Sequence, residues 1–351
     1  MRAEICHINL SNEFRGGERQ TGLLISALAE RGWPQRAIVR HSSPLARQLR
    51  GITGLRVVEK SGNLLSAALF GGRSDVIHVH QGRSLHVAGL QHLVRRRPYI
   101  VTRRVNNPVR PTLANRLGYG NAACVVTLTR AIAASVNAFD PSIDCQVIPS
   151  SPARLRHSPQ ASAQIKRRTG KQFLVGHVGE LDDATKGQLQ LIEAARVLQR
   201  ELPDIGFVLV GSGKDEARLQ AAAEGLDNVF FAGQVTNVGD YFAAFDVFAF
   251  PSRREGLGSS ILDAYQFGLP VVAARTGGIP EVVTNEVNGM LFDLDDISAL
   301  VAALRCYHHD EALRSEVGAR NANAAKRYAP EVIATEYERI YQHVLEGTAS
   351  R

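Results

Sequence analysis

The sequence contains few of the residues and runs that build metal centres, disulfide frameworks or membrane spans. Its 351 residues include four cysteines, two methionines and one tryptophan. Cys6, Cys124, Cys145 and Cys306 have no paired spacing of the kind that holds zinc. Three of them lie in or beside apolar runs, so we expect buried, reduced thiols. No window approaches the roughly 18 uninterrupted apolar residues of a spanning helix, which argues against an integral membrane protein.

The N-terminal sequence also lacks the pattern of a secretory signal. MRAEICHINL starts a predicted strand at once, without a charged leader followed by a long apolar stretch. We therefore expect a cytoplasmic protein. Any contact with the inner face of the cytoplasmic membrane is expected to be peripheral.

Acidic residues are scarce in the first part of the chain. Residues 1–152 contain 20 lysines and arginines against 8 aspartates and glutamates, or +12; the whole chain has +7, which leaves −5 for the remainder. This asymmetry predicts an anionic partner, either a phosphorylated lipid acceptor or an anionic bilayer surface. An arginine-rich surface from a GC-rich genome is the alternative. Nucleic acid is not expected, because the sequence has neither an aromatic-studded RNA platform nor a helix-turn-helix pattern.

Strand and helix patterns alternate along the whole chain. With 351 residues, 44% of them hydrophobic and 21% charged, the chain is too long for one ordinary core and fits two globular α/β domains. A segment rich in proline and serine, residues 150–159, predicts the hinge. We expect two Rossmann-like, doubly wound parallel sheets whose ligands gather at the carboxyl ends of the strands. The predicted strands are 5–10, 36–40, 56–58, 75–80, 99–103, 124–127 and 145–148, then 173–178, 207–210, 229–231, 247–250 and 271–273.

The stretch 250–281, FPSRREGLGSSILDAYQFGLPVVAARTGGIPE, predicts a strand end, a glycine loop, a helix, a strand and a glycine turn. Glu255 lies in the loop before the helix, and Asp263 lies within the helix, about 200° round from Ile261. Asp263 is therefore expected to point away from the buried face. The two carboxylates flank a helix N-terminus whose N–H groups and positive dipole end suit a phosphate. The buried face is predicted from an apolar stripe at helical spacing: Leu257, Ile261, Ala264, Tyr265 and Gly268.

This arrangement resembles the donor-binding motif of the family 4 glycosyltransferases, which are retaining enzymes of the two-domain GT-B fold. The matching parts are Pro251-Ser252, Glu255-Gly256, Asp263, residues 268–272 and residues 277–281. Asp263 stands where the family usually has the longer Glu. The resemblance implies that Glu255 accepts hydrogen bonds from the donor sugar and Asp263 from the ribose. The remaining donor-binding residues that it implies in this loop are Arg254, Gly256, Leu257, Gly258 and Ser259.

Three further segments of the second domain resemble the same family. In VGELDDATKGQLQLIEA, Lys186 is the cation expected on the donor phosphates, and Lys186 and Glu255 are the two residues expected to be catalytic. Glu180 occupies the place of a second, arginine cation. Gly211 and Gly213 in LVGSGKDEARL correspond to the nucleotide side, and Gln234 in FFAGQV to the segment that meets the nucleobase. The loss of the cation at position 180 weakens stabilisation of the leaving group unless another arginine replaces it, the candidates being Arg253, Arg254, Arg15 and Arg103.

A glycine pair follows the first predicted strand. Gly16 and Gly17 precede a helix expected over residues 18–31, and glycine lets the backbone approach a ligand closely. In the resembling family, such a pair abuts the donor diphosphate and sugar across the cleft between domains. Gly16 and Gly17 are therefore expected to complete the donor site.

Basic side chains follow two other strands of the first domain. In DVIHVHQGRS, His80 and Arg83 are expected to line the acceptor side, and His78 is expected to be a hydrogen-bonded strand histidine. The spacing offers no third ligand, so no zinc site is expected. In IVTRRVNNPVRP, Arg103 and Arg104 stand where many family members have a histidine, and either is expected to bind phosphate or an anionic acceptor.

An acidic string near the end of the second domain resembles the D-x-D motif by which other glycosyltransferases hold a metal. Asp293, Asp295 and Asp296 directly precede a helix expected from about residue 297, where Asp is a common N-cap. We expect the capping role and no bound metal.

Together these patterns predict a retaining, metal-independent glycosyltransferase without a cofactor. It would move a hexose-type sugar from a nucleotide-diphosphate sugar to a hydroxyl of a saccharide or lipid-linked acceptor, such as a lipopolysaccharide core or another cell-envelope glycan. The GT-B plan implies an acceptor-side domain of residues 1–152 with the returning helix of 330–351, and a donor-binding domain of 153–329. Two alternatives stay open: a non-catalytic nucleotide-sugar-binding partner protein, favoured by Glu180 and Arg103, and a GT-B nucleotide-sugar epimerase.

Overall fold

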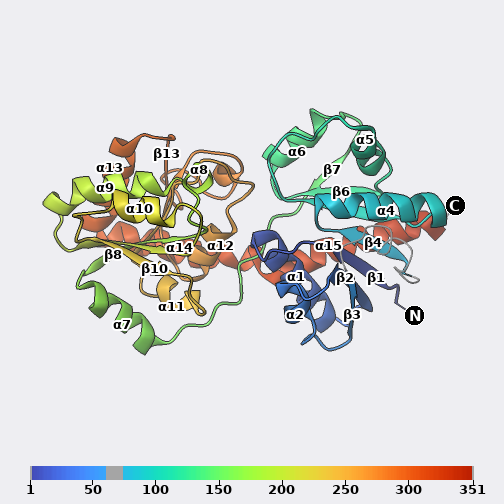
Figure 1. Ribbon diagram of the computed structural model, residues 1–351, viewed down its shortest axis with the longest axis horizontal. Helices are drawn as coiled ribbons and strands as arrows, with labels where there is room; N and C mark the ends of the chain where they lie inside the picture. The colour runs from blue at the N-terminus through green and yellow to red at the C-terminus, as the bar shows by residue number, and fades with distance from the viewer. Residues whose placement is uncertain (1, 61–73, 350–351) are drawn as a thin grey trace. The chain divides into compact units, whose positions relative to one another are not determined.

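The computed structural model describes residues 2–60 and 74–349, which form two compact units (Figure 1). The first unit comprises Met1–Ser151 together with Tyr328–Arg351, and the second comprises Pro152–Arg327. Each unit is built around its own parallel β-sheet with helices on both faces.

The first unit has a seven-stranded sheet in the order β3-β2-β1-β4-β5-β6-β7. This order reverses direction between β1 and β4, so the carboxyl ends of these two strands form the switch point at which doubly wound sheets bind ligands. The strands are β1 Ile5–Asn9, β2 Gln35–Arg40, β3 Leu55–Lys60, β4 Val76–Val79, β5 Tyr99–Arg103, β6 Cys124–Thr127 and β7 Cys145–Val147. The helices are α1 Gly16–Glu30, α2 Pro44–Leu49, α4 Gly82–Arg95, α5 Leu113–Gly120, α6 Arg130–Asn137 and α15 Pro330–Ala349.

Helix α15 is the last element of the chain, yet it lies beside α1 in the first unit (Figure 1). Tyr337 and Tyr341 of α15 belong to the same apolar cluster as Leu28 and Trp33. Glu338 accepts hydrogen bonds from the indole N–H of Trp33 and, at 2.7 Å, from the guanidinium of Arg31. Residues some 300 positions apart in sequence therefore form one core.

The second unit has a six-stranded sheet in the order β10-β9-β8-β11-β12-β13. Its switch point lies between β8 and β11. The strands are β8 Phe173–Val178, β9 Ile205–Val210, β10 Val229–Gly233, β11 Val247–Phe250, β12 Val271–Ala274 and β13 Met290–Phe292. The helices are α7 Pro159–Thr169, α8 Asp183–Lys186, α9 Gln188–Glu201, α10 Glu216–Ala222, α11 Val238–Phe242, α12 Ser259–Gln266, α13 Ile297–His309 and α14 Glu311–Ala325.

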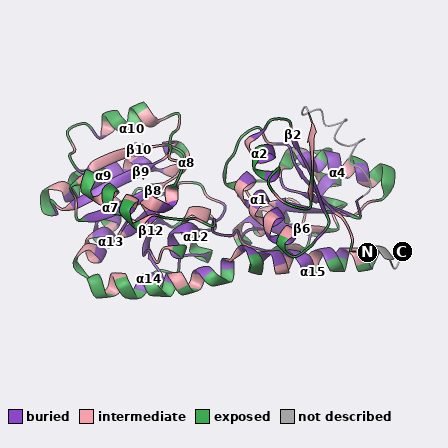
Figure 2. Ribbon diagram, turned by 90° about the horizontal axis from the view of Figure 1, so that it is seen from below, coloured by how far each residue is buried: buried purple, intermediate pink, exposed green. Residues whose placement is uncertain are grey.

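Every predicted strand is present, and in both units the buried residues follow the sheets while the outward helix faces are exposed (Figure 2). The short edge strand β13 was not predicted. Helix α1 begins at Gly16, two residues earlier than expected, because Glu18 receives the backbone N–H of Arg15 at 3.1 Å and so caps an earlier start. The four thiols are free as predicted, but only Cys6 is buried; the other three are partly exposed.

Candidate functional site

A lysine and a glutamate meet at the switch point of the second unit. The Lys186 ammonium donates to Glu255 Oε2 at 2.7 Å, and it also lies 5.5 Å from the centre of the Phe250 ring. Lys186 ends α8, in the loop after β8, and Glu255 lies in the loop after β11. Their side chains are 22% and 18% exposed, so the ion pair is shielded but open to a ligand. The structure thus brings together the two residues predicted to be catalytic.

Backbone hydrogen bonds fasten these two loops to each other. The N–H groups of Arg253 and Arg254 both donate to the carbonyl of Thr185, at 2.9 and 3.2 Å. The side-chain amide of Gln190 donates to the carbonyl of Pro251 at 3.0 Å. The loop that carries Lys186 and the loop that carries Glu255 therefore hold a fixed spacing before any ligand binds.

The glycine turn at residues 277–278 packs against the backbone of Glu255. Gly277 has a φ of 53°, and a Cβ built on it would lie 2.0 Å from the carbonyl oxygen of Glu255. Only glycine permits this approach. The Gly-Gly part of the sequence motif therefore shapes the backbone under Glu255.

The loop leads into α12 as predicted. Gly258, with a φ of 85°, is the N-cap residue, and α12 begins at Ser259. Gly256 and Leu257 are buried, and the Gly256 N–H donates to Glu255 Oε1 at 3.2 Å. The predicted donor-binding residues Arg254 and Ser259 are exposed and partly exposed respectively, at the same end of the helix. The first turn of α12 thus starts next to the Lys186–Glu255 pair.

Asp263 does not point away from the buried part of α12, as the helical spacing predicted. It is 1% exposed, and its Oδ1 accepts the backbone N–H of Ala153 at 2.7 Å. The prediction failed because α12 is buried on more than one side: α14 packs against it, and Ile261 to Tyr265 are all buried. In this structure Asp263 fastens the segment at the start of the second unit.

The remaining donor-side residues lie at the carboxyl ends of β9 and β10. Gly211 has a φ of 138°, and a Cβ there would lie 1.9 Å from the carbonyl of Gly179; at Gly213 a Cβ would meet Leu181. Gln234 is exposed and accepts from the Ser212 hydroxyl at 3.3 Å. Glycine at 211 and 213 therefore lets this loop pack on the loop after β8.

The candidate replacements for the missing phosphate cation differ in their partners. Arg253 forms a two-pronged ion pair with Asp295, at 2.6 and 2.9 Å. Arg254 is exposed beside the glycine loop, and Glu180 is likewise exposed. Asp295 thus holds the side chain of Arg253, whereas the structure shows no carboxylate pair for the side chain of Arg254 among the described residues.

The acidic string before α13 has the predicted capping role. Asp296 Oδ1 accepts the N–H of Ala299 at 2.9 Å, which caps α13. Asp295 binds Arg253, and Asp293 lies 3.3 Å from the Nε of Arg275. The three carboxylates thus have three different partners.

In the first unit, the glycine pair and Arg104 are neighbours. Gly16 and Gly17 form the start of α1, and a Cβ on Gly17 would lie 3.7 Å from Cδ of Arg104. Arg104 also borders a small pocket lined by Gln20, Tyr337 and residues 149–151. Its guanidinium donates to the carbonyl of His80 at 3.1 Å and reaches Nδ1 of the same residue at 3.2 Å. His80, Arg104 and the glycine pair therefore meet at one end of the sheet.

Arg103 has other partners in the described part of the structure. The Arg103 guanidinium donates to the Tyr119 hydroxyl at 3.1 Å and to the carbonyl of Asn107. It thus fixes the loop after β5. Arg83 lies in α4, but its side chain is outside the part of the chain that the structure describes.

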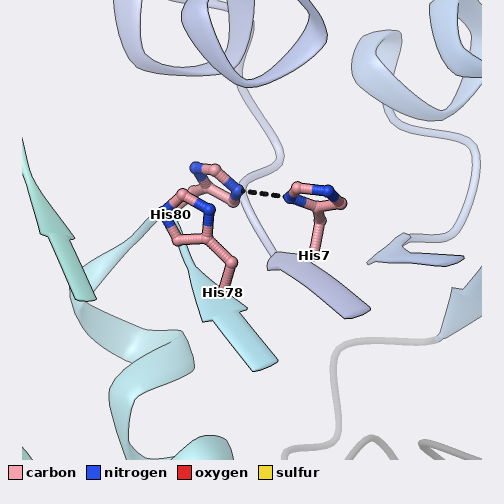
Figure 3. A group of neighbouring side chains, drawn as sticks. All are labelled: His7, His78 and His80. Carbon is pink, nitrogen blue, oxygen red and sulfur yellow. Dashed lines mark hydrogen bonds between the residues drawn. The ribbon is translucent and has the colours of Figure 1, made fainter. Parts of the chain in front are cut away.

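Three histidines gather where β1 and β4 lie side by side (Figure 3). One ring nitrogen from each of His7, His78 and His80 lies within 4.8 Å of the others. The expectation that no third ligand lies here was wrong: His7 stands opposite His78 in the register of the parallel pair, and His80 lies two residues further on the same face. The doubly wound order, which pairs the first strand with the strand at 75–80, is the signal that could have identified it.

The hydrogen bonds identify this cluster as a relay of neutral imidazoles. Arg104 can only donate, so Nδ1 of His80 accepts and its Nε2–H donates to Nδ1 of His7 at 3.0 Å. His7 Nε2–H then donates to Gln35 Oε1 at 3.0 Å, and the Gln35 amide donates to the carbonyl of Ile25. A metal at Nε2 of His80 would require a proton on Nδ1, which would face the Arg104 N–H. The cluster therefore fits a hydrogen-bond relay better than a metal centre.

His78 is held by a second set of hydroxyl groups. Its Nδ1 lies 2.7 Å from the Tyr341 hydroxyl, and its Nε2 lies 2.7 Å from the Thr102 hydroxyl, which in turn contacts Tyr337 at 3.1 Å. The prediction of a hydrogen-bonded strand histidine is confirmed. Burial lowers the pKa of His7 to about 3 and the pKa values of His78 and His80 well below the ordinary value, so all three rings are neutral near pH 7.

Residues 172–310 match the family described as "Glycosyl transferases group 1". Among curated proteins, the lipopolysaccharide core biosynthesis glycosyltransferase LpsD of Rhizobium meliloti is 26% identical over 99% of this chain and 100% of its own length. The sulfoquinovosyl transferase SQD2 of Arabidopsis thaliana is 32% identical over 44% of this chain and 30% of its own length. A GDP-mannose-dependent phosphatidylinositol monomannoside mannosyltransferase of Mycolicibacterium smegmatis is 33% identical over 56% of each chain. This chain thus spans about half or less of the length of the last two relatives.

Among solved structures, Anabaena HepE in complex with UDP and glucose superposes with a TM-score of 0.84 at 20% identity, over 97% of this chain and 100% of that chain. Sucrose-phosphate synthase of Thermosynechococcus elongatus superposes with a TM-score of 0.80 at 19% identity, over 99% and 100%. At such identities the likeness concerns the fold alone. None of the helices in residues 2–60 and 74–349 combines the length and apolar character that crossing a bilayer requires.

Proposed function

We propose that the chain is a glycosyltransferase of the GT-B fold and the family 4 type, and that it moves a hexose-type sugar from a nucleotide-diphosphate sugar with retention of anomeric configuration. The observation that carries the proposal is the Lys186–Glu255 pair, 2.7 Å apart at the carboxyl ends of β8 and β11. Without a ligand, the ammonium neutralises the carboxylate. A bound donor would give each group a partner of its own.

In this proposal Lys186 acts on the leaving group. Its ammonium would turn to the donor diphosphate and stabilise the charge that develops as the sugar leaves, together with the N–H groups at the start of α12. Glu255 would accept hydrogen bonds from the sugar hydroxyls and so fix the anomeric carbon. Arg254 would take the place of the second phosphate cation, since Arg253 is held by Asp295. These protein charges would suffice without a metal ion or another cofactor.

The remaining predicted residues would complete the donor site. We propose that Gly211, Gly213 and Gln234 form the nucleotide side through their backbone. The ribose role first expected for Asp263 would require its carboxylate to exchange the Ala153 N–H for a sugar hydroxyl. HepE binds UDP and glucose, which supports a nucleotide-diphosphate sugar as the donor class.

On the acceptor side, we propose a saccharide or lipid-linked hydroxyl compound that carries a negative charge. His80 holds the Arg104 guanidinium at the end of the sheet beside the glycine pair, where it would bind a phosphate or carboxylate. LpsD, which matches over its full length, is named as a glycosyltransferase of lipopolysaccharide core biosynthesis, and this supports an acceptor in cell-envelope glycan synthesis.

A thermal-shift screen against UDP, GDP, ADP, CMP and their sugars tests the donor. A nucleotide at about 100 times its dissociation constant should stabilise the protein by about 2.7 kcal/mol, and the screen identifies the base. NMR of the product then shows the anomeric configuration, and activity in EDTA tests whether a metal is needed. An inverted product would contradict retention.

A non-catalytic nucleotide-sugar-binding protein is the second candidate, favoured by Glu180 at the place of the family's arginine. The two candidates differ in turnover. The non-catalytic protein would be favoured if a nucleotide sugar stabilised the chain but was neither transferred to an acceptor nor slowly hydrolysed.

A further inference from the structure

One segment of the first unit contains arginine but no acidic residue. Residues 76–139 include nine arginines, no lysine, no aspartate and no glutamate. The segment runs from β4 to the end of α6 and includes both α4 and α5. It contributes most of the net positive charge of the first part of the chain, so its partner should be an extended anionic surface.

The same segment exposes large apolar side chains. Of the twelve exposed large hydrophobic residues in the described part of the chain, six lie between residues 76 and 139. On α4, Leu93 is 79% and Val94 69% exposed; on α5, Leu113 is 73% and Leu117 56% exposed. The other two are Leu90 and Val105. We name the four most exposed side chains on α4 and α5 the apolar patch.

The apolar patch lies on the outer sides of two helices that pack on each other. Helix α5 packs on α4 at Gly118, where a Cβ would lie 2.7 Å from the buried Leu85. Leu113 and Leu117 are one helical turn apart, and so are Leu90 and Val94, which makes each pair a stripe along its helix. The buried residues of α4 and α5 point to the core, so the stripes have no role in folding the unit.

Exposed arginines accompany the patch. Arg95 and Arg96 follow Val94 at the end of α4, Arg110 precedes α5, and Arg116 lies between Leu113 and Leu117. Apolar side chains that reach into the acyl boundary, with cationic side chains beside them, are the combination that binds the surface of an anionic bilayer. Because residues 76–139 contain no acidic side chain beside these arginines, the patch suits a surface of one charge sign, such as an anionic bilayer.

We propose that the apolar patch and its arginines dock the first unit on an anionic lipid bilayer. The docking rests on the proposed function, because a lipid-linked acceptor presents its sugar at such a surface. Leu93, Val94, Leu113 and Leu117 enter the headgroup region, and Arg96, Arg110 and Arg116 bind lipid phosphates.

Co-sedimentation of the full chain with vesicles tests this proposal. Vesicles of phosphatidylcholine with about one third phosphatidylglycerol should bind the protein at least about tenfold more tightly than pure phosphatidylcholine, and binding should weaken with salt. The double variant Leu93→Asp/Leu113→Asp should lose at least about tenfold in affinity for the anionic vesicles, and so should Arg96→Glu/Arg110→Glu. The matched control Val197→Asp/Val287→Asp, which changes exposed apolar side chains of the second unit, should bind like the wild type.

Two measurements, vesicle binding and the nucleotide-induced thermal shift, separate this proposal from the proposed function. The patch variants should keep the wild-type thermal stability and nucleotide-induced thermal shift, since the donor residues lie in another part of the chain. No binding of the wild type to anionic vesicles at low salt would overturn the docking proposal, and so would equal losses in the patch and control variants. Vesicle binding without any nucleotide-induced shift would support docking while it contradicts the donor proposal.

Discussion

At the scale of single residues, the main feature is the Lys186–Glu255 ion pair, whose mutual contact a bound donor would replace under the proposed function. Surface ion pairs contribute little to stability, with a median of about 0–1 kcal/mol. The Lys186–Glu255 pair is partly shielded and stands on two loops that backbone hydrogen bonds fasten together. Under the proposed function this pair binds the donor, and its two members should therefore fail in different ways when they are replaced.

Lys186→Ala should abolish most of the nucleotide-induced thermal shift, because the cation for the diphosphate is lost. Glu255→Gln should keep that shift but lower the rate of sugar transfer about 100-fold, since a neutral amide orients the sugar less well. Arg305→Ala, which removes an exposed ion pair with Glu201 in the same unit, is the matched control. Equal loss of nucleotide binding in all three variants would contradict the assigned roles. Thermal shift and transfer assays measure both effects.

Gly277 gives a second residue-scale prediction. Gly277→Ala places a methyl group 2.0 Å from the Glu255 carbonyl at a positive φ, so the Glu255 loop must move. We expect a destabilisation of about 2–4 kcal/mol and a strong loss of transfer. Gly225→Ala is the control, because Gly225 also has a positive φ, 78°, but no atom within 4 Å of its added Cβ. It should cost only about 1–2 kcal/mol, the price of the backbone conformation. Urea denaturation compares the two.

At the scale of elements, regular apolar patterns allowed the strands and the donor loop to be predicted, whereas contacts between distant elements did not follow from local spacing. The strand at 247–250 and the helix after Gly258 are local patterns, and both are present. Strand β13 has only three residues, too few to give a pattern. Asp263 was placed wrongly because helical spacing describes one buried side, and α14 covers another. His7 joins His78 only through the pairing of β1 with β4.

The histidine relay predicts how the first unit responds to acid. Its three imidazoles have pKa values lowered by burial, so as the pH falls below about 6.5 towards 5 the unfolded chain binds more protons than the folded chain. The stability contributed by the neutral rings is complete above about pH 6.5 and falls as the pH drops, by about 1.4 kcal/mol per pH unit for each histidine. Carboxylates titrate mainly below this window.

Urea denaturation of the first unit's transition at pH 7, 6 and 5 measures this slope. His7→Gln should reduce the slope by about one third, since one of three titrating rings is gone. His86→Gln changes an exposed histidine on α4 and should leave the slope as it is in the wild type. A slope that is identical in the wild type and His7→Gln would show that the relay does not control acid stability.

At the scale of the whole molecule, the two units differ in their charge and in whether their sequence is continuous. The acid-free segment 76–139 belongs to the first unit, and the Lys186–Glu255 pair belongs to the second. The end of the chain nevertheless returns to the first unit, where α15 covers Trp33 and reaches His78 through Tyr341. The first unit therefore cannot complete its core until α15 has been synthesised, whereas the second is continuous in sequence.

Glu338 of α15 should thus control the stability of the first unit. Glu338→Ala removes the acceptor of the buried Trp33 N–H and the partner of Arg31, so we expect the first unit to lose about 2–4 kcal/mol. Glu336→Ala, on the same helix but in an exposed pair with Arg339, should change stability by less than about 1 kcal/mol. Calorimetry with and without nucleotide identifies the transitions, because a donor nucleotide should raise the second unit's transition. If Glu338→Ala lowered the nucleotide-sensitive transition instead, α15 would stabilise the second unit, and the division of the chain at residues 327–328 would be wrong.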